Sequence, residues 1–147
     1  MNSIKTVTWA WGASGGNRPH AQSEAHLRHI VRYSVTPKGM YVREGKKDRK
    51  IVVVDVRETR TAKMADKFLK IDYNKDFELL LALRALVRGE ELEAEKIAGL
   101  PIEEIKELAE KMEKAKFGVV FFGLGLTQSD GRHMNIDAAV GLVSELN

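Results

Sequence analysis

The chain has 147 residues, of which 44% are hydrophobic and 31% charged, and its formal net charge is +3. This length and composition suit one domain with a single core, and no uncharged apolar run approaches the ~20 residues that a membrane-spanning helix needs. Because the sequence contains no cysteine, it excludes disulfides, thiolate zinc sites, iron–sulfur clusters and a cysteine nucleophile.

The first five residues have neither the basic nor the apolar region of a signal peptide, so we expect a cytoplasmic protein. The densest basic cluster, Val42 to Lys50, contains Gly45 and Asp48 and precedes a predicted strand, which indicates a surface turn. Basic residues do not line a face with interleaved aromatic residues. We therefore expect neither nucleic acid nor a membrane as a partner.

Two strands and a helix are predicted first in chain order. Residues 5–12 alternate apolar and polar side chains and stop at a glycine, as a strand does. Residues 23–33 have apolar side chains at helical spacing after Ser23, a residue favoured at helix N-termini. The β-branched run Ile51–Val54, which ends at Asp55, is typical of a strand buried on both faces of a parallel sheet.

The remaining pattern predicts a short strand over 67–73, helices over 76–88 and 101–116, a strand over 117–126 and a helix over 135–147. Asp76 is the expected N-cap of the first of these helices. The resulting order predicts an α/β fold: a three-layer, Rossmann-like, doubly wound domain with a mostly parallel sheet of about four strands and helices on both faces.

Ligands of such sheets bind at the carboxyl ends of the strands, where three loops are expected to meet. The first, residues 12–22, has Gly12 and Gly15 for close backbone approach, and Asn17 and Arg18 as donors to a phosphate. It matches neither a G-x-G-x-x-G motif nor a P-loop. A flexible loop without a ligand is therefore the alternative.

The second loop follows Asp55, and an acidic residue at this position commonly accepts hydrogen bonds from ribose hydroxyls or from the edge of a guanine. In an extended segment, Arg57, Thr59 and Thr61 would point to the same side as Asp55. The alternative is structural, with a capping aspartate and a solvated arginine.

The third loop, residues 123–133, begins like a dinucleotide fingerprint with Gly123 and Gly125, but Gln128 takes the place of the third glycine. A standard NAD site is therefore not indicated. The loop's polar side chains could read a base or hold a pyrophosphate, or could simply cap a helix. They are Thr127, Gln128, Arg132 and His133.

No catalytic and no metal-ligating residue is assigned from the sequence. His26 and His29 are spaced so that they could meet on one side of a helix, but further metal ligands do not accompany them. No serine lies in a nucleophile-elbow motif.

Four segments together resemble one family closely. "AHLRHIVRYSV", "VVVDVRETRTAKMAD", "AKFGVVFFGLGLTQ" and "GRHMNIDAA" are similar to the B subunit of formylmethanofuran dehydrogenases, which are molybdopterin oxidoreductases. The resemblance implies an archaeal enzyme of methanogenesis-type one-carbon metabolism. Such an enzyme reduces carbon dioxide to formate at tungsten or molybdenum held by two molybdopterin guanine dinucleotides, and a partner subunit attaches the formate to methanofuran.

By this resemblance, the whole of residues 1–147 would form the Rossmann-like domain that holds one molybdopterin guanine dinucleotide. The implied contacts are Gly12 and Asn17 with the pyrophosphate or nucleoside, Asp55 and Arg57 with the guanosine, and Gly123, Gly125, Thr127 and Gln128 with the second side of the cofactor. His26, Arg28 and His133 match polar positions near the active-site cavity.

The chain also departs from the family pattern. Its first loop is longer, Leu27 stands where proline is usual, and Val56 interrupts the usual Asp-Pro-Arg. The segments with the cluster-binding cysteines and the cysteine or selenocysteine metal ligand are missing. We therefore expect no activity of this chain alone and, as partners, other subunits or domains of the dehydrogenase. The rival interpretations are a Rossmann protein that binds NAD or ATP and a structural module that docks subunits; the oligomeric state is open.

Overall fold

The computed structural model describes residues 6–11, 36 and 45–147. Its main sheet has four parallel strands in the order β3-β2-β1-β6. The strands are β1 (Thr6–Trp11), β2 (Arg49–Asp55), β3 (Lys67–Lys70) and β6 (Gly118–Phe122). The expected helix over 23–33 and the loop over 12–22 lie outside the described residues.

Strand β2 is buried on both faces, as its β-branched sequence predicts. Val52 and Val54 belong to the main core cluster, whereas Ile51 and Val53 pack with Ala62 in a second cluster. Because side chains alternate along a strand, the two clusters lie on opposite faces of the sheet.

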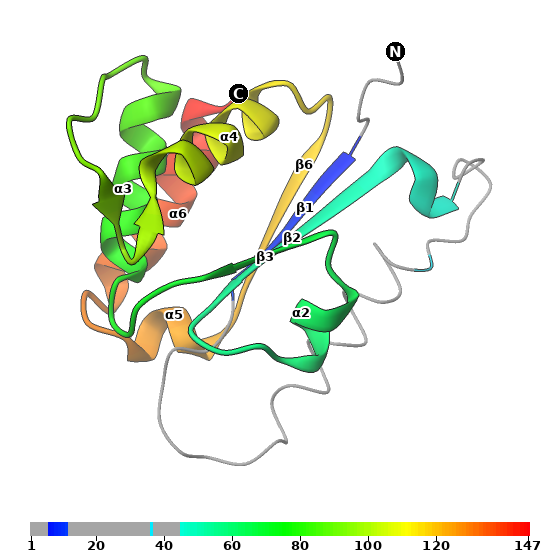
Figure 1. The fold of residues 1–147 in the computed structure, drawn as a ribbon, viewed down its shortest axis with the longest axis horizontal. Coiled ribbons are helices and arrows are strands. Elements are labelled where there is room, and N and C mark those ends of the chain that lie inside the picture. Colours follow the sequence, from blue (N-terminus) through cyan, green and yellow to red (C-terminus); the bar gives the residue numbers. More distant parts are fainter. Residues whose placement is uncertain (1–5, 12–35, 37–44) are drawn as a thin grey trace.

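Three helices build the main core: α3 (Asp76–Val87), α4 (Ile102–Glu113) and α6 (His133–Glu145). Figure 1 shows them on one side of the sheet, with the short helix α2 (Arg60–Met64) on the other side. Helix α4 buries Ile105 and Leu108 and exposes its charged face, as its 3.6-residue periodicity predicts.

The α/β class and the parallel sheet therefore agree with the sequence prediction. Numbered within the sheet, the strand order is 3-2-1-4, which is also the first part of the Rossmann order. The complete three-layer arrangement stays a prediction, because the helix expected between β1 and β2 is not among the described residues.

The predicted strand over 117–126 is wrong at its end. Strand β6 stops at Phe122, and residues Leu124–Gln128 form a short helix, α5. The amide of Leu126 donates to the Gly123 carbonyl (3.2 Å) and the amide of Ser129 to the Gly125 carbonyl (3.0 Å). The Gly-Leu-Gly-Leu stretch imitates the two-residue period of a strand, but glycine has no side chain to occupy either face.

Other boundaries differ by a few residues. Helix α3 has Lys75 rather than Asp76 at its N-cap, α6 begins at His133 rather than 135, and α4 begins at Ile102. A small hairpin of β4 (Lys96–Ile97) and β5 (Leu100–Pro101) was not predicted. Its two turn residues, Ala98 and Gly99, both have positive φ, as in a type I′ turn, and no Asn-Gly or Asp-Gly pair marks it in the sequence.

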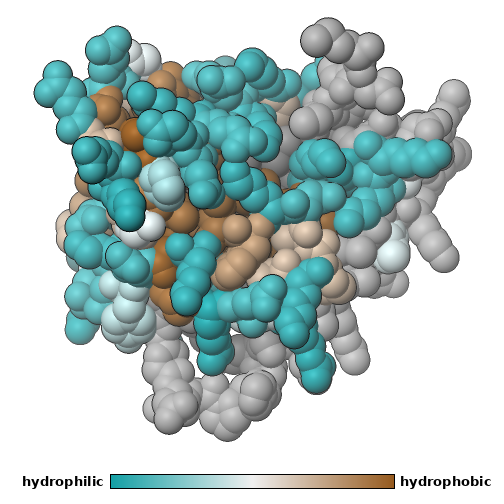
Figure 2. Space-filling view, in the orientation of Figure 1, coloured by the Kyte–Doolittle hydropathy of each residue, from teal (hydrophilic) through white to brown (hydrophobic). Residues whose placement is uncertain are grey.

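Polar side chains cover most of the face in Figure 2, and apolar side chains appear between them near the middle of the molecule. None of the helices in the described part of the chain has the length and apolar character needed to cross a membrane.

Candidate functional site

The strand register brings two of the predicted loops to one edge of the sheet. Val54 of β2 and Phe122 of β6 both pair with Trp11 of β1. Asp55 and Gly123 come next on either side of β1, two strand spacings or about 10 Å apart. We call this edge, where the parallel strands end, the carboxyl edge.

Asp55 is a buried carboxylate at the carboxyl edge, with a relative exposure of 4%. Burial raises its pKa above the ordinary value, and the backbone amides of Arg57 and Val56 and the Arg57 charge oppose this. The nearby Asp76 carboxylate adds to the increase. The Arg57 amide donates to Oδ1 over 3.3 Å. A carboxylate has about four acceptor positions, and the backbone amides of Arg57 and Val56 account for two of them.

The segment after Asp55 is not extended as far as expected. Thr59 is the N-cap of α2, and its hydroxyl accepts a hydrogen bond from the Ala62 amide (3.3 Å). Thr61 lies within this helix, and Ala62 of the helix packs against Ile51 and Val53 of β2. The expected alternation with Asp55 therefore ends before Thr61. Arg57 is exposed, and the cap is Thr59 rather than the aspartate.

The loop after β6 is also more ordered than expected. Gly123 is the N-cap of α5, and Gly125 is buried within that helix. Thr127 is half-buried and Gln128 is exposed. The expected contact of Gly125 with a cofactor stays a prediction.

Asn135 organises this loop, and the sequence analysis missed it. Its side chain is completely buried, and Nδ2 lies 2.8 Å from the Leu126 carbonyl oxygen, 2.9 Å from Ser129 Oγ and 3.0 Å from the Asp130 carbonyl oxygen. A Cβ at Gly131, where φ is +97°, would lie 2.6 Å from Asn135 Oδ1. Oδ1 is buried without a hydrogen-bond partner in the described part of the chain. The Asp-Gly turn signal before a buried polar residue was the available clue.

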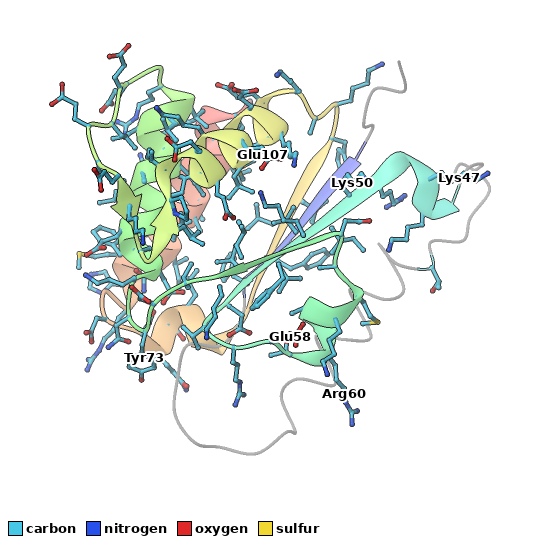
Figure 3. All side chains as sticks on the ribbon, viewed as in Figure 1. Lys47, Lys50, Glu58, Arg60, Tyr73 and Glu107 are labelled. Atoms are coloured by element: carbon cyan, nitrogen blue, oxygen red, sulfur yellow. The ribbon has the colours of Figure 1, made fainter. Side chains whose placement is uncertain are left out.

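A second contact ties this loop to the one after β3. Asn74 Nδ2 donates to Asp130 Oδ2 (2.9 Å), and the Asp130 amide donates to Asn74 Oδ1 (3.4 Å). Asn74 has a φ of 60°, a conformation that asparagine tolerates better than most residues. The neighbouring Tyr73 is 59% exposed. Figure 3 shows Tyr73 at the lower end of the molecule, where Glu58 and Arg60 also lie.

Arg132 and His133 begin α6, and both are exposed. The N-terminus of α6 follows the loop at the carboxyl edge, so its dipole adds partial positive charge there. Gly12, Asn17, His26 and Arg28 lie outside the described residues. In the described part of the chain, no group of three or more His, Asp or Glu side chains could hold a metal ion.

A groove of about 420 Å³ lies elsewhere, between α4 and the segment after α3. The C-terminal end of α4 leads into the start of β6, so the groove lies toward the amino ends of the strands. Its carboxylates make it unsuitable for phosphate. The lining residues are Leu86, Glu90, Glu91, Leu92, Glu93, Lys106, Ala109, Glu110 and Glu113.

Comparison with known proteins supports the resemblance found in the sequence. No protein-family model matches the chain. Two archaeal proteins, each named as the B subunit of tungsten-containing formylmethanofuran dehydrogenase 2, are both 46% identical to it over 133 residues. They come from Methanocaldococcus jannaschii and Methanococcus maripaludis. The match covers 90% of this chain but 30% of each relative, so the chain spans less than a third of their length.

Proposed function

Because the chain is similar to part of the B subunit of tungsten-containing formylmethanofuran dehydrogenases, we propose that it is a cofactor-binding domain of that kind. Its carboxyl edge would hold the guanine nucleotide end of a molybdopterin guanine dinucleotide. The observation that carries the proposal is the position of Asp55: a carboxylate buried at the carboxyl edge, about 10 Å from the loop after β6.

The chemistry of guanine favours such a carboxylate. The Watson–Crick edge of guanine presents two adjacent N–H donors, N1–H and the N2 amine, and a carboxylate can accept both. Hydrogen bonds to a charged acceptor contribute about 1.5–3 kcal/mol. Adenine has a different donor and acceptor pattern on this edge. Asp55 would therefore select guanine, and Arg57 would lie beside the guanosine.

The remaining predicted contacts extend this site. Thr59, Thr61, Gly123, Gly125, Thr127, Gln128 and His133 would border the nucleotide from the described loops. Gly12, Asn17, His26 and Arg28 would complete the pyrophosphate side. The strand order supports one three-layer Rossmann-like domain over residues 1–147.

The bound cofactor would supply tungsten or molybdenum redox chemistry, and this chain would bind and orient the nucleotide. With no cysteine, the chain offers no thiolate to the metal, so we propose that it is inactive without other dehydrogenase subunits or domains. We propose a cytoplasmic location, as expected for such a complex.

Calorimetric titration of the full chain with GDP, ATP and NAD tests the proposal. We expect GDP to bind in preference to the other two, and Asp55→Asn to weaken GDP binding about 10- to 100-fold. Asp66→Asn is the matched control, because Asp66 lies near the opposite end of β2 and its Oδ2 accepts a hydrogen bond from the Ile51 amide (2.9 Å).

The rival functions predict other results. Preference for NAD or ATP would favour an ordinary nucleotide-binding protein. Binding of none of the three would favour a structural docking module. Equal losses in the Asp55 and Asp66 variants would mean that Asp55 supports the fold rather than the ligand.

A further inference from the structure

Strand β6 lies at one end of the described sheet, and its sequence does not protect it from pairing. It pairs with β1 on one side, and no strand within the described ranges pairs with its other side. Exposed edge strands usually carry a charge, a proline or a bulge. Gly118–Phe122 carries no charged residue and no proline, and its side chains are exposed or half-buried. The outer edge of β6 can therefore accept another strand.

The sequence around β6 is complementary to itself. In an antiparallel pair of two copies centred on Val120, Phe117 lies opposite Gly123, Gly118 opposite Phe122, and Val119 opposite Phe121. Aromatic residues facing glycine, and aromatic residues facing β-branched residues, are stabilising cross-strand pairs. The register brings no like charges together.

This register would cover exposed aromatic surface on both faces of the sheet. Phe122 is 37% exposed and Phe117 62% exposed. Val120 and Phe122 share register positions with Val52 and Val54 of the main core, so they point toward the helices α3, α4 and α6. Phe117 is five positions from Phe122 and points to the opposite face.

Helix α6 adds apolar surface on the helix side of the sheet. It packs into the same core cluster as Val120. Its outward residues Met134, Val140 and Val143 are 46%, 59% and 38% exposed.

We propose that β6 is a self-association surface, through which two copies of this chain pair antiparallel about a two-fold axis. The pairing joins two four-stranded sheets into one continuous sheet. A two-fold interface uses the same patch on both copies, which is what a self-complementary strand provides. This inference does not depend on the nucleotide site.

Light scattering coupled to gel filtration of the full chain, over a dilution series, measures the association. The expected mass is twice that of the 16.5 kDa chain. Gly118→Lys should raise the dimer dissociation constant at least about tenfold, since lysine would stand opposite Phe122 of the second copy. Within one chain the change is tolerated, because a Cβ at Gly118 has nothing within 4 Å.

Phe117→Lys and Tyr73→Lys form a matched pair, since the two aromatic residues are 62% and 59% exposed. The first should weaken the dimer, whereas the second should leave it intact. Circular dichroism checks that each variant is folded.

Single cysteines test the register, because the natural chain has none. Residue 120 lies on the two-fold axis, so the two Val120→Cys residues would be about 5 Å apart and form a disulfide on oxidation. Two Phe117→Cys residues would be ~20 Å apart and would not. A monomeric natural chain, a dimer unaffected by Gly118→Lys, or equal cross-linking of the two cysteine variants would each overturn the proposal.

Discussion

The carboxyl edge of the sheet and the edge where its strands begin are held together in different ways. At the carboxyl edge, buried side chains bind backbone groups: Asn135 holds the loop after α5, and Asp55 accepts a backbone amide. The opposite, amino edge also has exposed ion pairs. Glu107 accepts hydrogen bonds from Lys67 (2.6 Å) and from Lys111. In Figure 3, Glu107 and Lys50 lie at the opposite end of the molecule from Tyr73.

This difference shows where the structure fixes positions most strictly. Buried hydrogen bonds to backbone groups are costly to lose because the freed groups stay away from water. Exposed ion pairs contribute little and are weakened by salt. The carboxyl edge therefore has the rigid loops that a binding site needs, whereas the exposed ion pairs of the amino edge can change with little consequence.

Asn135→Ala is expected to give the largest effect. It leaves the Leu126 and Asp130 carbonyls without the Asn135 amide, and should lower the free energy of unfolding by about 3 kcal/mol. Urea denaturation measures this. Asn147→Ala is the control, because Asn147 Nδ2 donates to the Val143 carbonyl (2.7 Å) in an exposed position. Equal losses in the two variants would remove the contrast between buried and exposed contacts.

Gly131→Ala should have the next largest effect, about 2 kcal/mol, because positive φ and the approach of Asn135 Oδ1 act together. Gly45→Ala separates the two causes. Gly45 also has positive φ (+58°), but a Cβ there meets nothing within 4 Å. If thermal denaturation shows the same loss for both, the close approach of Asn135 has no energetic role.

Asp55 should make the protein less stable as pH rises. Its folded-state pKa is above the ordinary value of 3.8, so its contribution to stability is fully present below pH 3.8 and is lost as pH rises through the folded-state pKa. Asp55→Asn removes this dependence. We expect the urea midpoint of the variant to rise relative to the natural chain between pH 3 and pH 7. A constant difference would contradict the burial of an ionisable carboxylate there.

Glu107 should behave in the opposite way and give the smallest effect. Hydrogen bonds from Lys111 and Lys67 lower its pKa from 4.5 to about 2. Its contribution is therefore present above pH 4.5 and is lost as pH falls toward about 2. Glu107→Gln should shift the urea midpoint slightly at neutral pH, and 1 M salt should abolish the difference because the group is exposed. A salt-independent shift would contradict this account.

The parts of the fold that follow from periodicity were predictable. Strand β2 has a β-branched run and α4 has a strong apolar stripe, so each element carries its own signal. Helix α2 was missed because it is short and depends on the Thr59 cap and the burial of Ala62. Helix α5 was mistaken for strand because its glycines alternate with leucines.

The candidate site was predictable only in part. The position of Asp55 at the carboxyl edge was predictable because it ends a recognisable strand, and the parallel order places it across β1 from the loop after β6. Asn135 was missed because its acceptors are backbone carbonyls and a serine hydroxyl, whose positions depend on the folded loop. Sequence spacing does not reveal such partners.

The most direct measurement of the central claim compares GDP with IDP, which lacks the N2 amine of guanine, on the natural chain and on Asp55→Asn. If Asp55 accepts from this amine, the natural chain should bind GDP about tenfold or more tightly than IDP, and the variant should bind both equally. The same GDP preference in both proteins would show that Asp55 does not read the base.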